Sequence, residues 1–153
     1  MSVEKIIFGA GCFWGVEATF RKIKGVHNVT CGYTGGHTSN PAYNAVCTGM
    51  TGHIEAVQVE YDVSQVTFEV LLDTFWRCHN PTTRDQQGPD IGTQYRSTIF
   101  FYTPEQEASA ELSKKELQAS YQNQIIVTEI LPVATFYPAE EYHQRYFEKH
   151  GIH

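Results

Sequence analysis

The sequence predicts an α+β fold, a ferredoxin-like two-layer sandwich in which helices pack on a mixed or antiparallel sheet. Short segments rich in β-branched and aromatic residues alternate with longer segments whose apolar residues recur at helical spacing. Their order, β-α-β-β-α-β-α-β-α, is the order expected when helices cover one sheet. With 153 residues, the chain fits a single catalytic domain spanning residues 1–153.

Five segments have the pattern of strands. In residues 53–61, Val57, Val59 and Tyr61 alternate with polar residues and define one buried face. Glu55 has the same parity, so it points to that face as well. The other predicted strands are residues 3–8, 26–33, 97–102 and 125–131.

Four segments have the pattern of helices. Residues 68–78 carry apolar side chains at positions i, i+3, i+4, i+7 and i+8, a stripe that should pack on the sheet. Pro104 marks the start of a helix over 104–121, because proline is favoured in a first helical turn. The other predicted helices are residues 13–24 and 139–149.

Two connections, residues 34–52 and 79–96, are each close to twenty residues long and rich in Gly, Asn, Pro and Thr. Loops of this length in a compact domain are usually functional or disordered. Both contain tyrosines, among them Tyr43 and Tyr95, which makes disorder the weaker interpretation. The tyrosines are either packing anchors or members of a site formed by long active-site loops.

Composition excludes several classes of protein. The net charge of −6 argues against a nucleic-acid-binding protein, and no segment is apolar enough to predict a membrane span. The four cysteines, at positions 12, 31, 47 and 78, form no C-x-x-C pair and no metal-ligand spacing. We therefore expect free thiols in a reducing compartment, the cytoplasm, no metal and no bound cofactor.

The segment around Cys12 is the most informative part of the chain. An apolar run ends at Gly9, Gly11 permits a sharp turn, and helical spacing begins after Cys12. A cysteine at a helix N-terminus meets unpaired N–H groups and the positive end of the helix dipole, which favour the nucleophilic thiolate. We therefore expect a reactive thiolate at Cys12.

The segment around Cys12 allows other interpretations. The glycines run G-x-G-x-x-x-G, and no acidic residue follows about 20 positions later, so a dinucleotide site is disfavoured. Cys12 as an inert buried thiol stays open, since free cysteine is often buried. Phe13 and Trp14 are either ordinary core residues or the walls of a small apolar pocket beside the sulfur.

Glu55 is the second candidate for chemistry. A lone carboxylate on a buried face is costly, and burial raises its pKa. A carboxyl group with a raised pKa is a usable acid near neutral pH. The alternative is a position at the end of the strand where Glu55 faces water.

Taken together, the motifs resemble those of the A-type methionine sulfoxide reductases, the peptide-methionine (S)-S-oxide reductases. The resemblance covers nearly the whole chain. The matching runs are Gly11-Cys12-Phe13-Trp14-Gly15, Gly32-Tyr33-Thr34-Gly35-Gly36, Asn40-Pro41-Ala42-Tyr43, Thr51-Gly52-His53-Ile54-Glu55-Ala56-Val57, Gly92-Thr93-Gln94-Tyr95-Arg96-Ser97 and Phe136-Tyr137-Pro138-Ala139-Glu140-Glu141-Tyr142-His143-Gln144.

The resemblance implies a role for each matching residue. Cys12 would attack the sulfoxide sulfur, and Glu55 would protonate or hydrogen-bond the sulfoxide oxygen. Tyr43 and Tyr95 would be two phenols that hold the same oxygen, and Phe13 and Trp14 would enclose the S-methyl group. Asp90 would be an aspartate that supports the site. A sulfoxide becomes a good electrophile only when its oxygen accepts a proton, so this set suits the reaction.

The resemblance also implies the reaction. The S epimer of methionine sulfoxide, free or in oxidised proteins, would be reduced to methionine while Cys12 becomes a sulfenic acid. A second thiol must then reduce Cys12, and we expect an external thiol such as thioredoxin or a glutaredoxin-type protein. We expect a monomer without nucleic-acid or membrane partners.

Many members of the family that the motifs resemble carry resolving cysteines in a glycine-rich C-terminal tail. This sequence has no cysteine after Cys78. Cys31 could form a disulfide with Cys12 if their Cα atoms come within about 7 Å, and it is our resolving candidate. Direct reduction of Cys12 by an external thiol is the equal alternative, and Cys47 and Cys78 are the remaining candidates. For Cys47 and Cys78 we expect ordinary packing.

Two further classes of function compete with an enzyme. A thiol-based redox sensor would react with peroxide much faster than with a sulfoxide. A small binding domain that uses Phe13 and Trp14 would keep its affinity without the thiol of Cys12.

Overall fold

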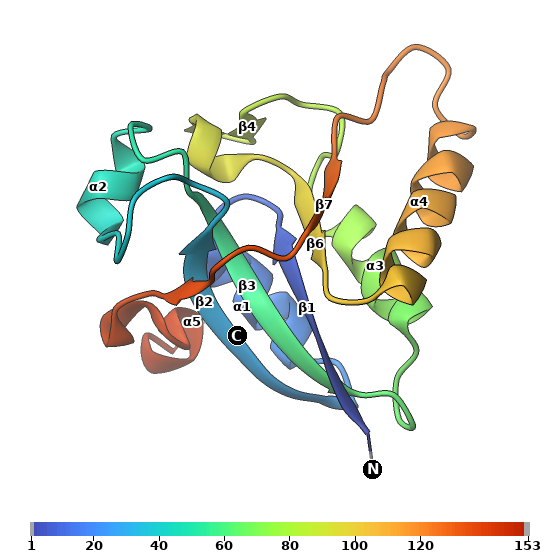
Figure 1. The fold of residues 1–153 in the computed structure, drawn as a ribbon, viewed down its shortest axis with the longest axis horizontal. Helices are drawn as coiled ribbons and strands as arrows, with labels where there is room; N and C mark the ends of the chain where they lie inside the picture. The colour runs from blue at the N-terminus through green and yellow to red at the C-terminus, as the bar shows by residue number, and fades with distance from the viewer. Residues whose placement is uncertain (1, 152–153) are drawn as a thin grey trace.

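We describe residues 2–151 of a computed structural model. Its main sheet has six strands in the order β7-β6-β1-β3-β2-β8 (Figure 1). The β6 and β7 strands are parallel, and the other neighbours are antiparallel. The prediction of an α+β fold with a mixed sheet is therefore confirmed. The strands are β1 (Val3–Gly9), β2 (Val26–Thr34), β3 (Ile54–Asp62), β6 (Thr98–Phe101), β7 (Glu129–Pro132) and β8 (Tyr137–Pro138).

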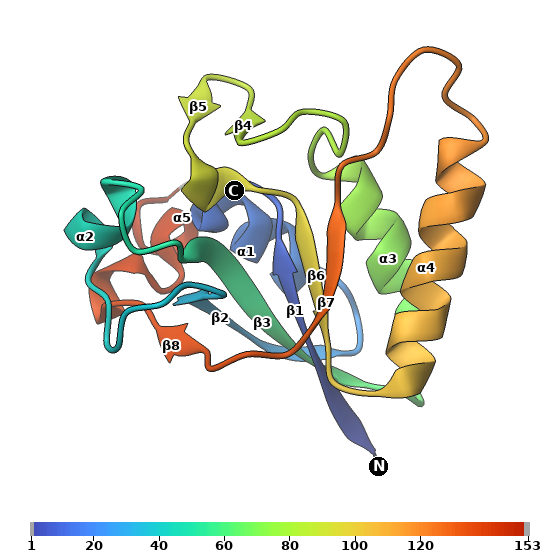
Figure 2. The same ribbon diagram turned by 45° about the horizontal axis from the view of Figure 1, so that its top comes forward.

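Three helices provide the second layer: α1 (Phe13–Arg21), α3 (Phe68–Arg77) and α4 (Pro104–Gln118) (Figures 1 and 2). Phe8 of β1 stacks on Phe20 of α1 and on Phe75 of α3, with ring centroids 5.0 and 4.9 Å apart. The α1 and α3 helices therefore share one face of the sheet, where the main core lies. The hydroxyls of Thr67 and Thr103 accept hydrogen bonds from the first turns of α3 and α4.

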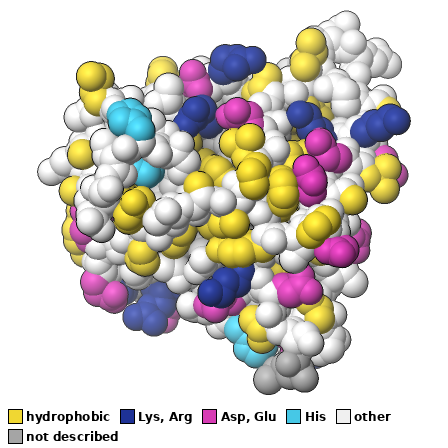
Figure 3. All heavy atoms as spheres, viewed as in Figure 1, with side chains coloured by type: hydrophobic (Ala, Val, Ile, Leu, Met, Phe, Trp, Pro, Cys, Tyr) yellow, Lys and Arg dark blue, Asp and Glu magenta, His cyan; other side chains and the backbone are white. Residues whose placement is uncertain are grey.

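The other face of the sheet carries a smaller core. Ile7, Ile54, Ala56 and Phe100 are buried there, and Phe136 packs on them. Phe136 belongs to the segment that joins β7 to β8 and crosses the front of the sheet in Figure 1. Figure 3 shows hydrophobic side chains gathered across the middle of this face.

The two long loops contain short elements that the sequence did not predict. The first loop contains α2 (Tyr43–Cys47), and the second contains a hairpin of β4 (Gln86–Gln87) and β5 (Asp90–Ile91), then a 3₁₀ helix, Thr93–Tyr95. In Figure 2 these elements lie together above one end of the sheet. None of the helices within residues 2–151 is long and apolar enough to cross a membrane.

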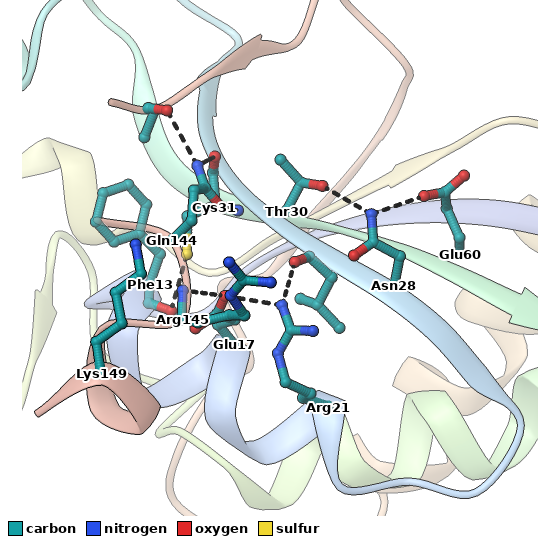
Figure 4. A network of polar contacts seen from close by, with 12 residues as sticks. Phe13, Glu17, Arg21, Asn28, Thr30, Cys31, Glu60, Gln144, Arg145 and Lys149 are labelled. Atoms are coloured by element: carbon teal, nitrogen blue, oxygen red, sulfur yellow. Dashed lines mark hydrogen bonds and ion pairs between the residues drawn. The ribbon is translucent and has the colours of Figure 1, made fainter. Parts of the chain in front are cut away.

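The predicted helix over residues 139–149 is wrong. The chain forms a 3₁₀ helix, Glu141–His143, and then α5 (Tyr146–Lys149). Between them Arg145 adopts φ 52°, and its N–H donates to Glu17 Oε2 at 2.7 Å. The side chain of Gln144 bonds both the N–H and the carbonyl of Cys31. These long-range contacts override the local helical pattern (Figure 4).

Several other predicted segments extend beyond the observed elements. The α1 and α4 helices end at Arg21 and Gln118. The predicted strand over residues 125–131 begins only at Glu129, because the preceding N–H groups bond elsewhere. Ile126 donates to the Gln118 side chain and Val127 to the carbonyl of Pro81, each at 2.8 Å.

Candidate active site

Cys12 lies where β1 passes into α1. Gly11 takes φ 99°, which turns the chain sharply, and Cys12 is the N-cap residue of α1. A Cβ at position 11 would also lie 3.0 Å from the side chain of Gln87. The predicted helix N-terminus at Cys12 is therefore confirmed, and its side chain is partly exposed.

The expectation that the helix end makes Cys12 a thiolate in the resting protein is wrong. Burial raises the pKa of its thiol to about 11. The N–H groups of Trp14 and Gly15 lower this pKa, but the charges of Glu55 and Asp90 raise it further. Desolvation thus outweighs the helix end, and Cys12 is a thiol at neutral pH.

Glu55 lies on β3 with a carboxyl group against the start of α1. Only 1% of the residue is exposed, as the strand pattern predicted, and the N–H of Phe13 donates to its Oε1 at 3.2 Å. Burial raises the Glu55 pKa to about 7, the Phe13 N–H lowers it, and Asp90 raises it. Its Oε2 is buried and has no hydrogen-bond partner within residues 2–151. Glu55 is therefore an acid near neutral pH with one free oxygen.

The two long loops bring Tyr43, Tyr95 and Asp90 to this carboxyl group. Both tyrosines are half-buried. Burial first, and the Glu55 charge second, raise the Tyr95 pKa to about 12. Burial, a contact with Cys47 and the Glu55 charge raise the Tyr43 pKa further. Both phenols stay protonated and can donate hydrogen bonds. The charge of Asp90, on β5, raises the pKa values of Cys12, Glu55 and Tyr95.

Phe13 and Trp14 follow Cys12 in the first turn of α1 and join a group of rings. Phe13 is buried and lies 6.4 Å from Tyr43 between centroids. Trp14 stacks on Tyr146 at 3.8 Å with an interplanar angle of 8°. Its indole N–H donates to Nδ1 of His143 at 3.0 Å. These rings pack together beside Cys12.

Sequence reasoning assigned no role to Glu140 or His143, although both stand in the late motif. Glu140 Oε1 accepts from the Tyr33 hydroxyl at 2.8 Å, and its Oε2 accepts from the Tyr43 N–H at 3.1 Å. His143 is completely buried between the rings of Tyr43 and Trp14. The signal that could have found them is their position in a run rich in polar and aromatic residues.

Cys31 lies on β2 beside the same turn of α1. Its Sγ donates to the Phe13 carbonyl at 3.6 Å, and its side chain is completely buried. Burial above all, together with the charges of Glu17 and Cys12, raises its pKa far above the usual range. Gln144 holds its backbone N–H and carbonyl at 2.8 and 2.9 Å (Figure 4). Cys31 is thus close to the site but protonated and fixed.

The remaining cysteines, Cys47 and Cys78, lie at the ends of α2 and α3. Cys78 is partly buried after α3 and donates to the Phe75 carbonyl at 3.3 Å. Cys47 is exposed at the end of α2, so the expectation of ordinary packing is wrong for this residue. No group of three or more His, Cys, Asp or Glu side chains within residues 2–151 is arranged to hold a metal ion.

Comparison with known proteins identifies the family. Residues 4–153 match the family model for peptide methionine sulfoxide reductase. A protein of Methanoculleus marisnigri named peptide methionine sulfoxide reductase MsrA is 58% identical over 98% of this chain and 92% of its own length. The chain belongs to the peptide methionine sulfoxide reductase family. The resemblance read from its motifs is confirmed, and the protein is an enzyme of the A type.

Solved structures agree with this assignment to the peptide methionine sulfoxide reductases. Reduced Mxr1 from Saccharomyces cerevisiae is 38% identical, with a TM-score of 0.91 over 97% of this chain and 86% of that one. Mxr1 in complex with Trx2 is 29% identical over the matched part, with a TM-score of 0.67 over 94% of this chain and 84% of that one.

Proposed function

We propose that this protein reduces the S epimer of methionine sulfoxide, free or in oxidised proteins, to methionine and so repairs proteins. The observation that carries this proposal is the Glu55 carboxyl group. It has a pKa of about 7, a free Oε2 and a position beside the start of α1, where Cys12 lies. An acid of this kind can activate a sulfoxide, and a nearby sulfur can attack it.

The reaction balances with one thiol. The Cys12 thiol gives its proton to the Glu55 carboxylate, and Glu55 passes that proton to the sulfoxide oxygen as the thiolate attacks the sulfoxide sulfur and forms an S–S bond. The protonated oxygen then passes from the substrate sulfur to the Cys12 sulfur, as the S–O and S–S bonds to the substrate sulfur break, so that Cys12 becomes a sulfenic acid. Methionine leaves as the reduced product, and Glu55 is again a carboxylate.

The surrounding residues have separate roles in this proposal. Tyr43 and Tyr95 are neutral phenols whose hydroxyls hold the sulfoxide oxygen. Phe13 and Trp14 enclose the S-methyl group. The charge of Asp90 helps to raise the pKa of Glu55. A pocket that fixes the methyl group on one side and the oxygen on the other accepts one epimer at sulfur only.

A second thiol then attacks the sulfenic acid, forms a disulfide with Cys12 and releases water, and a further thiol reduces this disulfide. We propose an external thiol of the thioredoxin type, because Cys12 is partly exposed and the related Mxr1 forms a complex with Trx2. Cys31 is the internal alternative. Its burial, its raised pKa and its bonds to Gln144 all disfavour attack unless the segment around Gln144 moves.

The first test is substitution of the two reacting groups. Cys12→Ser should abolish formation of methionine from methionine sulfoxide, and Glu55→Gln should slow it by about 100-fold or more at neutral pH. Cys78→Ser and Glu60→Gln are matched controls, because neither side chain faces the site. Methionine is measured by chromatography in single-turnover reactions. Unchanged turnover in either test variant would contradict the assigned role.

The recycling step has its own test. The reduced protein is given one equivalent of methionine sulfoxide without external thiol, and its cysteines are mapped by mass spectrometry. A lone oxidised Cys12 supports the external route, whereas a Cys12–Cys31 linkage supports the internal one. A redox sensor would instead oxidise much faster with peroxide than with the sulfoxide.

We also propose that residues 1–153 form one catalytic domain that acts as a monomer in a reducing compartment, the cytoplasm. All four cysteines are free, which suits such a compartment. Sedimentation of the reduced protein tests the oligomeric state, and retention of activity after limited proteolysis tests the single domain.

A further inference from the structure

His143 is a buried imidazole beside the proposed pocket, and the proposed mechanism gives His143 no role. It ends the 3₁₀ helix Glu141–His143, and none of its surface is exposed. The residues before it, Glu141 and Tyr142, are exposed. A single imidazole therefore points inward from an otherwise exposed turn.

The hydrogen bond of His143 fixes its protonation state. The indole N–H of Trp14 can only donate, so Nδ1 of His143 must accept at 3.0 Å and carry no proton. The imidazole is then neutral with its proton on Nε2. Burial lowers the His143 pKa, which agrees with a neutral ring.

The other nitrogen of His143 has no hydrogen bond within residues 2–151. The carboxyl oxygen Oε1 of Glu140 is 4.0 Å away and already accepts from Tyr33. Burial of an unpaired N–H costs free energy, and an apolar side chain would avoid that cost. The bond to Trp14 is the polar contact that a purely apolar side chain could not provide.

His143 also contacts both halves of the proposed pocket. Its ring centroid lies 5.2 Å from that of Phe13 and 5.6 Å from that of Trp14, the two rings assigned to the S-methyl group. It lies 4.4 Å from Tyr43, which is assigned to the oxygen. Tyr146 covers the face of the Trp14 indole, whereas His143 holds its edge.

We propose that His143 is a positioning residue for substrate binding: its neutral Nδ1 holds the Trp14 indole in the orientation that forms the methyl side of the pocket. The inference rests on the proposed function. It assigns His143 no proton transfer to the substrate. Loss of the acceptor should therefore weaken binding of methionine sulfoxide more than it slows the bond-breaking step.

Two variants separate this role from simple packing. His143→Asn keeps an acceptor oxygen near the place of Nδ1, whereas His143→Leu fills the space without one. In single-turnover reactions, the leucine variant should raise the half-saturating methionine sulfoxide concentration about five- to tenfold and change the limiting rate less than about twofold. The asparagine variant should restore most of the wild-type half-saturation.

A spectroscopic measurement follows the Trp14 bond directly. The protein has two tryptophans, so its ¹H–¹⁵N spectrum should contain two indole signals, which Trp76→Phe assigns. His143→Leu should move the Trp14 indole proton upfield, and His143→Asn should return it toward the wild-type position. This readout needs no turnover, so it tests the hydrogen bond even if the wild-type protein fails to reduce methionine sulfoxide.

A double-mutant cycle tests whether His143 acts through Trp14. In a Trp14→Phe background, His143→Leu should change half-saturation by less than about twofold, because the bond is already absent. Equal losses in the asparagine and leucine variants, or the same loss of affinity from His143→Leu with and without Trp14, would overturn the proposal. An unmoved Trp14 indole signal in the leucine variant would do the same.

Discussion

At the scale of single residues, the site depends on where one proton lies. The Cys12 pKa is about 11 and the Glu55 pKa about 7. Thiol with carboxylate is therefore favoured over thiolate with carboxylic acid in the resting protein. Both arrangements contain a single proton, so the reactive arrangement is a minor form with the same total charge. In the proposed reaction, this proton passes to the sulfoxide oxygen, which Tyr43 and Tyr95 hold.

This shared proton predicts an unusual pH profile. Below pH 7 both groups are protonated, and the reactive form with one proton becomes tenfold rarer with each pH unit. We expect kcat/KM to rise with pH up to about 7 and then to stay level into the alkaline range. Stopped-flow rates for methionine sulfoxide reduction between pH 5 and 10 check this profile.

The same measurement on Glu55→Gln shows which group causes the bend. Without a carboxyl group, the rate should be low but should continue to rise above pH 7 as the thiol ionises. A bend near pH 7 that survives in Glu55→Gln would mean that another group titrates, and the assignment of the shared proton would fail.

At the scale of elements, α2 depends on a residue far away in sequence. Its N-cap residue, Ala42, has no side chain that can cap, and Glu140 Oε2 accepts from the first N–H of the helix, that of Tyr43, at 3.1 Å. Burial tends to raise the Glu140 pKa, but the Tyr43 N–H and other donors bring it below its ordinary value. Glu140 therefore caps α2 as a carboxylate and places Tyr43.

Removal of this cap should loosen α2 without unfolding the protein. Glu140→Ala should cost about 1 kcal/mol locally, increase amide exchange in residues 43–47 severalfold and lower kcat/KM. Hydrogen exchange with mass spectrometry measures the first effect. Glu141→Ala is the matched control, because the Glu141 side chain is exposed and bonds Lys149. Equal exchange in both variants would contradict the capping role.

The sequence predicted the elements whose causes are local. Strand alternation placed Glu55 in the core, and the glycine turn placed Cys12 at the start of α1. The α2 helix and the chain after Pro138 escaped prediction because their partners, such as Glu140 for Tyr43 and Cys31 for Gln144, are distant in sequence. For the same reason the protonation of Cys12 was predicted wrongly: desolvation depends on what the fold packs around the sulfur.

At the scale of the whole molecule, a second histidine links stability to pH. His79 follows α3, and its Nδ1 and Nε2 lie 2.7 Å from the Phe75 carbonyl and 2.6 Å from the Ser97 hydroxyl. Burial lowers its pKa to about 4, although the Phe75 carbonyl tends to raise it. Because the unfolded chain takes up this proton near pH 6.5, stability from the neutral ring is present above pH 6.5 and is lost as the pH falls toward 4.

His79→Gln should therefore flatten the acid side of the stability curve. We expect the wild type to lose about 2 kcal/mol more than the variant between pH 6.5 and 4, a value reduced for the partial exposure of the ring. Urea unfolding at several pH values measures the difference. Glu55 acts in the opposite sense, since its raised pKa favours the folded state at low pH, but it is common to both proteins. Parallel curves would contradict the assignment to His79.

The hydrogen bond between Trp14 and His143 joins residues 129 positions apart in the chain. During synthesis, Cys12 therefore leaves the ribosome long before the residues that complete its surroundings. A nascent chain that lacks residues 140–144 would have an incomplete pocket around Cys12, so the proposed repair activity should begin only after these residues have been made.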